Sequence, residues 1–498
     1  MFNVFLYVTG ALIVLSLVLL LGFAVYLTNV RRKFAHIPSP PMASFFKGHA
    51  DEITAMRHTG FPTDQKFLEW HIEYGKILVV WFWHVPVLLV ADSEMVKDIY
   101  IVKNLPKEEV SYEVLARLFG QRFLGTGLVT NVDNESWKKR RVILNPAFHR
   151  KSLKDLMDSF NSTANILLEH LGTMADGKTE VCMCDQFARA ALDVICKVAF
   201  GMDIDIINAR DTKFTEAVSL TFHGVEEASF DLFHKYKVNQ YPFQRRVVKA
   251  IQFLRETGRK VIEVRKNAMK KGEEVPDDIL QHIIKLQDQN PDFGMEDVLD
   301  DFVTFFIAGH ETTATLLSFC VLELGDHPEI LESLVGEVFD VLGDKQNVAF
   351  DDLAKLHQLG LVIKETLRRH PPATGLLRKI TKDQEIGGYK MPADVAILTS
   401  TYVSSHFPEY WTNPEEFDPY RFDDEELVKR SHYNYFPFSL GPRNCIGQHF
   451  AQIEAKVLLS RFLQTFKFSL VPGQSRKILE RTTLRPKDGV ICTLTKRQ

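Results

Sequence analysis

The sequence predicts a mainly α-helical fold with a small β region (α+β), preceded by one N-terminal transmembrane helix. Residues 4–27 are apolar and uncharged, and residues 92–373 repeat apolar positions every three or four residues. Runs of β-branched and aromatic residues are confined to 77–90 and 374–400. A period near 3.6 indicates helices, and short β-branched runs indicate strands. With 498 residues and 45% hydrophobic content, the chain can bury a large core.

The apolar segment 4–27 can cross a bilayer, because roughly 24 residues at about 1.5 Å each exceed a ~30 Å hydrocarbon core. The alternative is a cleaved signal peptide, but its basic start, shorter apolar run and small-residue cleavage site are not evident. Arg31, Arg32 and Lys33 follow at once. Because basic flanks stay on the cytosolic side, we expect an uncleaved anchor with a cytosolic body.

The chain is expected to divide into three parts. Residues 1–30 form the anchor, residues 31–48 form a basic and proline-rich linker, and residues 49–498 form the cytosolic domain. The linker contains the run Ile37-Pro38-Ser39-Pro40-Pro41. Prolines fix φ and favour an extended, stiff connector, so this linker should set the angle between the body and the membrane.

Charge and cysteine content exclude two classes of protein. The formal net charge is -4, which provides no basic face for nucleic acid. The six cysteines are too few for a disulfide framework in a chain of this length, and a cytosolic body would keep them reduced. Each cysteine is therefore expected to be a free thiol. They are Cys182, Cys184, Cys196, Cys320, Cys445 and Cys492.

Local patterns locate several elements. Residues 77–82 and 85–90 predict a strand pair. Residues 235–271 carry many Lys and Arg around a few apolar positions, which predicts a long surface helix with one buried stripe. The aromatic-rich segment 222–243 leaves two interpretations open, contact with lipid or packing in the core.

The segment 438–447 places Cys445 in a glycine-punctuated loop, just before a helix-like run from Phe450 to Leu463. Gly441 and Gly447 let the backbone approach a flat ligand closely. Exposed N–H groups and the positive end of the following helix favour a thiolate. The alternative is a buried structural cysteine, which is the default for the other five cysteines.

Residues 438–447 match the haem-binding signature Phe-x-x-Gly-x-Arg-x-Cys-x-Gly, and by this motif the chain resembles the cytochrome P450 superfamily. The resemblance implies a cytochrome P450 fold and haem b as cofactor, with Cys445 as the axial ligand of the iron. It also implies that Phe438, Arg443 and Gly447 contact the cofactor. Because a thiolate on haem iron promotes O–O cleavage, the expected activity is insertion of one oxygen atom of O2 into a substrate.

A second candidate site lies in the predicted helix 301–322, where polar residues interrupt an apolar run. Ala308 and Thr312 share one helix face, so the small residue leaves room above a porphyrin and the hydroxyl reaches towards dioxygen. Glu311 points about 100° away from Thr312 and would relay protons through water or by swinging. The resemblance assigns the same pair to proton delivery.

This segment has two alternative interpretations. His310-Glu311 begins like the zinc motif His-Glu-x-x-His, but position 314 is alanine, so that motif is absent. The Thr312 hydroxyl could also bond only to the carbonyl of Ala308, four residues earlier. That second interpretation is compatible with a role in proton delivery.

Further matches to the superfamily lie elsewhere in the chain. Glu365 and Arg368 are three apart and share a helix face, and the resemblance adds Arg421 to make a buried structural triad. Haem propionates are carboxylates, for which Arg is the best bidentate partner. Beside Arg443, the resemblance supplies Trp137, Arg141 and Arg378 as propionate contacts, and Ala308 as a contact with the porphyrin.

The chain is expected to obtain its electrons from a partner. It contains no glycine-rich dinucleotide fingerprint and no appended reductase, so NADPH should act through a separate flavoprotein reductase. Lys138, Lys139 and Arg140 would lie near the cysteine side of the haem and could dock an acidic donor. We expect a monomer in the endoplasmic reticulum membrane, single-pass, with a cytosolic catalytic domain.

The substrate expectation comes from a narrower resemblance, to the cholesterol 24-hydroxylase family, over stretches that include 301–312, 435–441 and 470–474. It implies hydroxylation of a hydrophobic lipid, a sterol first of all, at an unactivated carbon. Residues 368–372 and 374–377 depart from that family. A fatty-acid or xenobiotic hydroxylase is the alternative, followed by a haem-thiolate isomerase or dehydratase. A haem sensor or lipid-binding membrane protein would need no proton relay.

Overall fold

The protein is described by a computed structural model that covers residues 2–56, 59–208, 213–230, 237–289, 293–423 and 431–497. Its helices are α1 (Phe2–Arg32), α2 (Ala50–Met56), α3 (Thr63–Tyr74), α4 (Ser93–Lys97), α5 (Glu109–Ala116), α6 (Asn134–Leu144), α7 (Arg150–Asp155), α8 (Met157–Gly172), α9 (Met183–Phe200), α10 (Lys213–Phe230), α11 (Tyr241–Lys270), α12 (Ile279–Gln289), α13 (Met295–Asp326), α14 (Pro328–Leu342), α15 (His357–Arg369), α16 (Thr401–His406) and α18 (Gln448–Thr465).

The strands form small sheets. A four-stranded sheet has the order β1 (Ile77–Phe82), β2 (Val85–Val90), β9 (Val395–Ser400), β6 (Gly375–Ile380), and a three-stranded sheet has the order β10 (Phe466–Leu470), β13 (Ile491–Lys496), β5 (Val181–Cys182). The two-stranded pairs are β11 (Ile478–Glu480) with β12 (Leu484–Pro486), β3 (Arg117–Leu118) with β4 (Gln121–Arg122), and β7 (Gln384–Ile386) with β8 (Tyr389–Met391).

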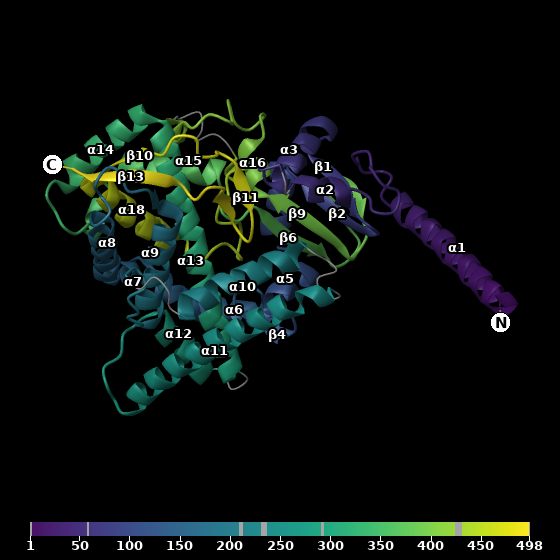
Figure 1. Ribbon diagram of the computed structural model, residues 1–498, viewed down its shortest axis with the longest axis horizontal. Helices are drawn as coiled ribbons and strands as arrows, with labels where there is room; N and C mark the ends of the chain where they lie inside the picture. Colours follow the sequence, from purple (N-terminus) through teal and green to yellow (C-terminus); the bar gives the residue numbers. More distant parts are fainter. Residues whose placement is uncertain are drawn as a thin grey trace.

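The fold class predicted from the sequence is confirmed: the chain is mainly helical, with small sheets and an apolar N-terminal helix. Figure 1 shows most of the helices gathered on one side and the four-stranded sheet, with α2 and α3 beside it, on the other, and α1 projecting beyond the sheet. The predicted strand pair at the start of that sheet is also confirmed, with Ile77 opposite Val90 and Phe82 opposite Val85.

Helix α1 is long and apolar enough to cross a membrane over Val4–Arg32. Its outer part is exposed, whereas its last turns contact the body, where Leu27 is fully buried. The ring of Phe34, just beyond the helix, packs edge-on against Trp81 of β1 at 5.5 Å. The N-terminal helix therefore joins the body through packed side chains.

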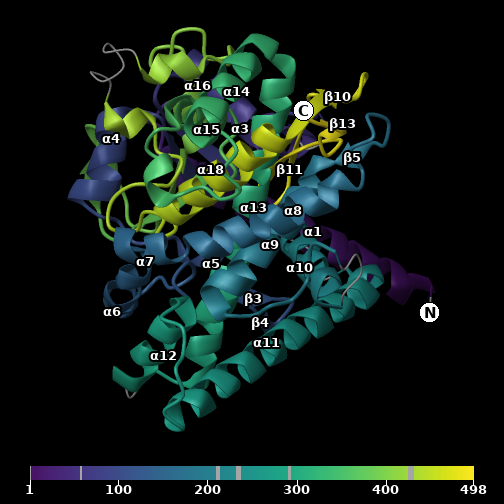
Figure 2. The same ribbon diagram turned by 90° about the vertical axis from the view of Figure 1, so that its left-hand side faces the viewer.

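Helix α13 lies at the centre of the helical part, with α8, α9 and α18 around it (Figure 2). It is apolar enough to resemble a membrane span, but it is buried and forms part of the main core. Gly309 lets α9 come close, because a Cβ on this residue would stand 2.8 Å from Ile195. Farther along the same contact, the rings of Phe200 and Phe302 lie 4.1 Å apart.

The predicted basic surface helix is present as α11, and Figure 2 shows it running along one edge of the molecule. Its buried stripe includes Val247, Ile251 and Leu254. Of the aromatic-rich segment before it, Phe222 is buried in the main core and Phe243 packs against that core. Residues 231–236 of that segment lie outside the described residues.

Candidate functional site

A cavity of about 320 Å³ separates α13 from the loop that carries Cys445. On the α13 side it is bordered by Thr304, Phe305, Ala308, Gly309, Thr312, Thr313 and Leu316. On the opposite side it is bordered by Pro437, Phe438, Ser439, Arg443, Asn444, Cys445, Ile446, Gly447, Phe450 and Ala451. The two segments that the sequence singled out therefore face one enclosed space.

The cysteine loop is held in a tight backbone conformation. The N–H of Cys445 donates to the carbonyl of Phe438 at 2.8 Å. Gly441 has φ +71, and a Cβ at this position would lie 2.3 Å from the carbonyl oxygen of Tyr100. Only glycine tolerates both that φ and that close approach. The loop is thereby pressed against the chain near Tyr100 while its sulfur faces the cavity.

The Cys445 thiol is open to the cavity although protein atoms enclose it. Burial raises the pKa of this thiol, whereas the N–H of Gly447 and the guanidinium of Arg141 lower it. Helix α18 begins directly afterwards, at Gln448. The N–H group, the cation and the helix N-terminus all favour an anionic sulfur, which is the form that binds a metal.

Glu365, Arg368 and Arg421 come together in the interior. The Glu365 carboxylate accepts two bonds from Arg368, at 2.8 and 2.9 Å, and one from Arg421 at 3.1 Å. Glu365 and Arg368 are fully buried and Arg421 is nearly so. Two cations share one carboxylate here, and such a cluster is stable only when its remaining donors are also satisfied.

The remaining donors of this triad bind backbone carbonyls of the segment that approaches the cysteine loop. Arg368 donates to the carbonyls of Ser405 and Pro414, at 2.8 and 2.7 Å. Arg421 donates to the carbonyl of Thr412 at 2.8 Å. The triad therefore ties helix α15 to an irregular stretch of chain that has few backbone bonds of its own.

Several cationic side chains border the cavity beside the cysteine loop. Arg443 donates to the carbonyl of Asn131 at 2.5 Å, and its guanidinium lies 4.3 Å from the ring centre of Trp137. Arg378 is buried and stacks over Tyr100 at 4.6 Å. In the described part of the chain, neither cation forms an ion pair with a carboxylate.

Lys107 is a third basic residue at this wall, and it is half-buried. Its ammonium donates to the carbonyl of Val129 at 2.5 Å and lies 4.2 Å from the ring centre of Tyr112. Burial, followed by the charges of Arg378 and Arg443, holds the pKa of Lys107 well below its usual value. The sequence analysis missed Lys107 and Tyr112, because no local pattern distinguishes them from other loop and helix residues.

Arg141 and Trp137 also border the cavity, from helix α6. Arg141 donates to the carbonyl and to the side-chain oxygen of Asn444, at 2.7 and 2.9 Å. It therefore braces the residue that precedes Cys445. Burial lowers the pKa of Arg141, and the neighbouring Cys445 opposes that shift.

The neighbouring Arg140 does not belong to a docking surface, so that prediction was wrong for this residue. It is buried, and it donates to Asp301 at 3.1 Å and to Asp297 at 3.0 Å, both on α13. Lys138 and Lys139 remain exposed. Because Arg140 and Arg141 point in different directions, α6 is held between α13 on one side and the cysteine loop on the other.

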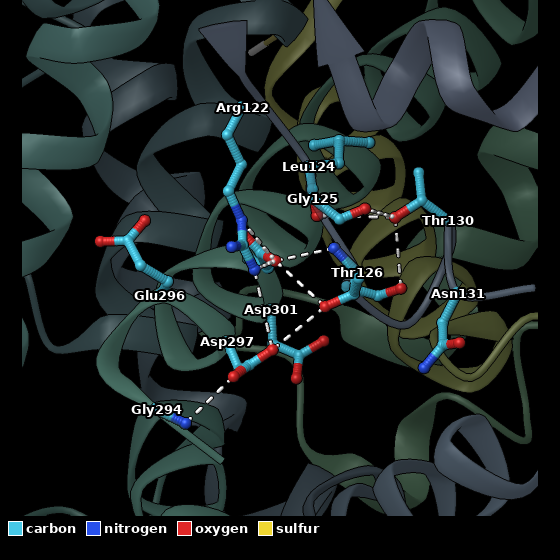
Figure 3. A network of polar contacts seen from close by, with 12 residues as sticks. Arg122, Leu124, Gly125, Thr126, Thr130, Asn131, Gly294, Glu296, Asp297 and Asp301 are labelled. Carbon is cyan, nitrogen blue, oxygen red and sulfur yellow. Dashed lines mark hydrogen bonds and ion pairs between the residues drawn. The ribbon is translucent and has the colours of Figure 1, made fainter. Parts of the chain in front are cut away.

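The carboxylates at the start of α13 form a wider network with the segment 122–131 (Figure 3). Asp300 accepts from Arg122 at 2.6 Å and from the N–H of Thr126 at 2.7 Å. Asp301 accepts from the N–H of Leu128 at 2.8 Å, and burial raises its pKa to about 6. Leu128 borders the cavity, so this network positions part of the cavity wall.

Unpaired buried cations are costly, so their partner is expected to be an anion bound in the cavity. Lys107, Arg378 and Arg443 could together receive two carboxylates at one edge of a flat ligand. The sulfur of Cys445 stands at the same cavity and could hold a metal at the centre of that ligand. The residues present therefore fit haem b, with its two propionates and its iron.

Across the cavity, Ala308 and Thr312 lie on one face of α13. The Thr312 hydroxyl donates to the carbonyl of Ala308 at 2.9 Å. This is the bond within the helix that the sequence analysis named as an alternative for this segment. Glu311 is buried on another side of the helix, where Arg485 of β12 donates to its carboxylate. Arg485 is a further residue that sequence reasoning missed, because it lies in a hairpin near the end of the chain.

Comparisons with known proteins agree with this arrangement. A profile of the family described as "Cytochrome P450" matches residues 38–493. The chain is 31% identical to "Cytochrome P450 3A9" of Rattus norvegicus, with 92% of this chain and 90% of the relative covered. It is 31% identical to "Cytochrome P450 4V2" of Homo sapiens, with 93% and 90% covered. It is 30% identical to "11-oxo-beta-amyrin 30-oxidase" of Glycyrrhiza uralensis, with 85% and 81% covered. The narrower similarity to cholesterol 24-hydroxylase stays a prediction.

Replacing Glu365 with alanine is expected to prevent stable haem incorporation. Two buried arginines would lose their shared carboxylate, which typically costs ~3–5 kcal/mol. The reduced carbon monoxide difference spectrum and the thermal midpoint measure the effect. Glu385→Ala, at an exposed glutamate of β7, is the matched control. A normal haem spectrum in Glu365→Ala would contradict this prediction.

Replacing Lys107 with methionine is expected to speed the loss of haem from the purified protein by roughly tenfold or more. A hydrogen bond to a charged group contributes about 1.5–3 kcal/mol, and 1.4 kcal/mol is a factor of ten. Haem transfer to an excess of a haem-binding acceptor protein measures the rate. The control is Lys103→Met, because Lys103 is paired with Asp98. Equal transfer rates for Lys107→Met and wild type would refute the contact.

Proposed function

The chain belongs to the cytochrome P450 family, and on that premise we propose that it is a membrane-anchored monooxygenase that hydroxylates a hydrophobic lipid, a sterol first of all. The observation that carries this proposal is the enclosed cavity that Cys445, Ala308 and Thr312 border together. Burying apolar surface contributes about 25 cal/mol per Å², so an enclosed site with many apolar side chains favours a lipid.

The sterol assignment rests on the narrower resemblance at 301–312, 435–441 and 470–474. A fatty acid or xenobiotic is the second candidate, because the chain departs from the sterol hydroxylases at 374–377 and Leu376 of that stretch borders the cavity. An isomerase or dehydratase is a weaker candidate, since it would have no use for Glu311 and Thr312 as proton donors.

Haem binding is proposed to use residues on two sides of the cavity. Cys445 would hold the iron of haem b through its thiolate, and Phe438 and Gly447 would contact the cofactor beside it. Trp137, Arg141, Arg378, Arg443 and Lys107 would hold the propionates. When bound, haem supplies the centre at which dioxygen is reduced and one of its atoms is inserted into the substrate. The triad of Glu365, Arg368 and Arg421 would keep the cysteine loop in its place.

Proton delivery is proposed to run along α13. The small side chain of Ala308 leaves space beside the Thr312 hydroxyl, which can accept a hydrogen bond from water and pass a proton into the cavity. Burial raises the pKa of Glu311, which favours the protonated form of this carboxyl more than in water. Glu311 would supply that proton and recover it from solvent.

The proposed location rests on the apolar N-terminal helix, and the proposed redox partner rests on the basic residues near the cysteine loop. We expect residues 1–30 to cross the endoplasmic reticulum membrane once as an anchor. Residues 31–48 would link this anchor to residues 49–498, which would form a monomeric cytosolic domain. Electrons would come from NADPH through a separate flavoprotein reductase. The exposed Lys138 and Lys139, near the cysteine side, could dock its acidic surface.

The substrate class is tested by a spectral titration of the purified enzyme. Cholesterol and related sterols are expected to displace water from the haem and shift its absorption with saturable binding. A saturated fatty acid and a planar xenobiotic are measured beside them. Tighter binding of the fatty acid than of every sterol would reject the sterol assignment and leave the monooxygenase intact.

Replacing Thr312 with alanine is expected to preserve haem and substrate binding but to divert electrons into hydrogen peroxide. Loss of a general acid or base typically costs about 10²–10⁴-fold, so we expect product formation to fall roughly 10²-fold. Product, peroxide and NADPH consumption are measured together. Ser318→Ala is the control, because Ser318 makes the same bond to a carbonyl four residues earlier but does not border the cavity. Fully coupled turnover in Thr312→Ala would remove the proposed role.

A further inference from the structure

Glu311 is held by a residue that lies near the C-terminus, far from it in the sequence. Its side chain is 4% exposed and forms an ion pair with Arg485, whose side chain is 35% exposed. Thr483 is a second polar neighbour of the carboxylate and lowers its pKa. The pair therefore connects a buried acid on α13 with a cation that reaches solvent.

Arg485 belongs to the hairpin β11–β12, which is fixed to other parts of the molecule. Glu480 accepts from the N–H of Thr63 at 2.7 Å, and the N–H of Ile478 donates to Gly60 at 2.9 Å. The hydroxyls of Thr483 and Thr315 lie 3.3 Å apart. These contacts hold the hairpin against both α3 and α13.

The same hairpin also reaches α10. Arg481 is in the turn of this hairpin, and its guanidinium lies 3.8 Å from the carboxylate of Glu226 on α10. Its side chain is 46% exposed, so this second ion pair is weaker than the pair between Arg485 and Glu311. A displacement of α10 or of the hairpin would therefore be transmitted to Glu311 through the three residues between Arg481 and Arg485.

We propose that the β11–β12 hairpin is a latch on the proton donor, in which Arg485 holds the Glu311 carboxylate away from Thr312 until the ion pair opens. The inference rests on the proposed role of Glu311. Arg485 is then a positioning residue: it touches neither the cavity nor the reacting atoms and acts only through Glu311.

The charges around Glu311 make it sensitive to Arg485. Burial raises the pKa of Glu311, and Arg485, followed by Thr483 and then Arg481, opposes that rise. His310 on the same helix is neutral, because burial and the charge of Arg485 lower its pKa to about 3. Cys184 of α9 is neutral too, since burial raises its pKa to about 12. Among the described residues, Arg485 is therefore the cation that dominates the protonation of Glu311.

The latch implies a closed proton cycle. While paired with Arg485, the carboxylate can take a proton from water at the exposed side of the hairpin. A neutral carboxyl loses most of its attraction to the guanidinium, so the ion pair opens and the side chain can turn towards Thr312. After the O–H proton has passed to the Thr312 hydroxyl or its water, the carboxylate returns to Arg485.

The direct test is an infrared titration of the carboxyl group in the resting holoenzyme. The difference spectrum between wild type and Glu311→Gln isolates the Glu311 C=O stretch, and its pH midpoint is compared with that of Arg485→Gln. An opposite charge in contact lowers a carboxyl pKa by about 1–3 units, so the midpoint should rise by about one pH unit or more in Arg485→Gln. Arg485→Lys should restore most of the wild-type midpoint.

Two further variants keep the test decisive. Arg481→Gln should shift the midpoint in the same direction by less, and it serves if Arg485→Gln fails to fold. Arg476→Gln is the matched control, because Arg476 lies in the same C-terminal segment but pairs at the surface with Asp326, the last residue of α13. An unchanged midpoint in Arg485→Gln, or in Arg481→Gln if the former is unfolded, would overturn the latch.

The pH dependence of turnover separates this inference from the proposed function. The pH at which kcat falls should rise by about one pH unit in Arg485→Gln, because Glu311 without its cationic partner keeps its proton up to a higher pH. If Glu311→Gln leaves coupling and this profile unchanged, the proposed role of Glu311 fails. If Glu311→Gln abolishes the pH dependence of kcat while Arg485→Gln does not shift it, Glu311 keeps its proposed role as proton donor and the latch is rejected.

Discussion

The site depends on one buried carboxylate, that of Glu365. It lies on a regular helix, α15, and through Arg368 and Arg421 it fixes an irregular stretch of chain that leads to the cysteine loop. Loops cannot hold their shape by backbone bonds alone, and here charged donors satisfy the loop's carbonyls. Such a cluster contributes less to net stability than to a single geometry, and a metal ligand needs that geometry.

The wall beside the cysteine shows the opposite balance of charge. Lys107, Arg378 and Arg443 border the cavity, and among the described residues none of them forms an ion pair with a carboxylate. At the start of α13, by contrast, the aspartates are paired with arginines from α6, β4 and α11. The paired network builds the scaffold. We propose that the unpaired basic side chains receive an anionic ligand, such as the propionates of haem.

Adjacent residues of α13 face different parts of the protein, because a helix turns by about 100° per residue. Thr312 borders the cavity, while Glu311 faces the β11–β12 hairpin and Arg485. This separation keeps the acid in a place where its charge is controlled by one cation at the edge of solvent. It also keeps a carboxylate out of the cavity in which an apolar substrate would lie.

Local pattern in the sequence was enough for the features that depend on neighbours along the chain. These are the apolar N-terminal helix, the strand pair at 77–90, the long helix around Thr312, and the cysteine loop followed by α18. The spacing of Glu365 and Arg368 put them on one helix face, while Arg421, Arg141, Arg378 and Arg443 were named from the resemblance alone. Tertiary structure decided the rest: Arg140 turned inward to Asp301, Lys107 joined the cationic wall, and Arg485 met Glu311. The physical reason is that a charged side chain in a sequence is solvated by default, and only the folded chain determines which charges lose their water and which partners replace it.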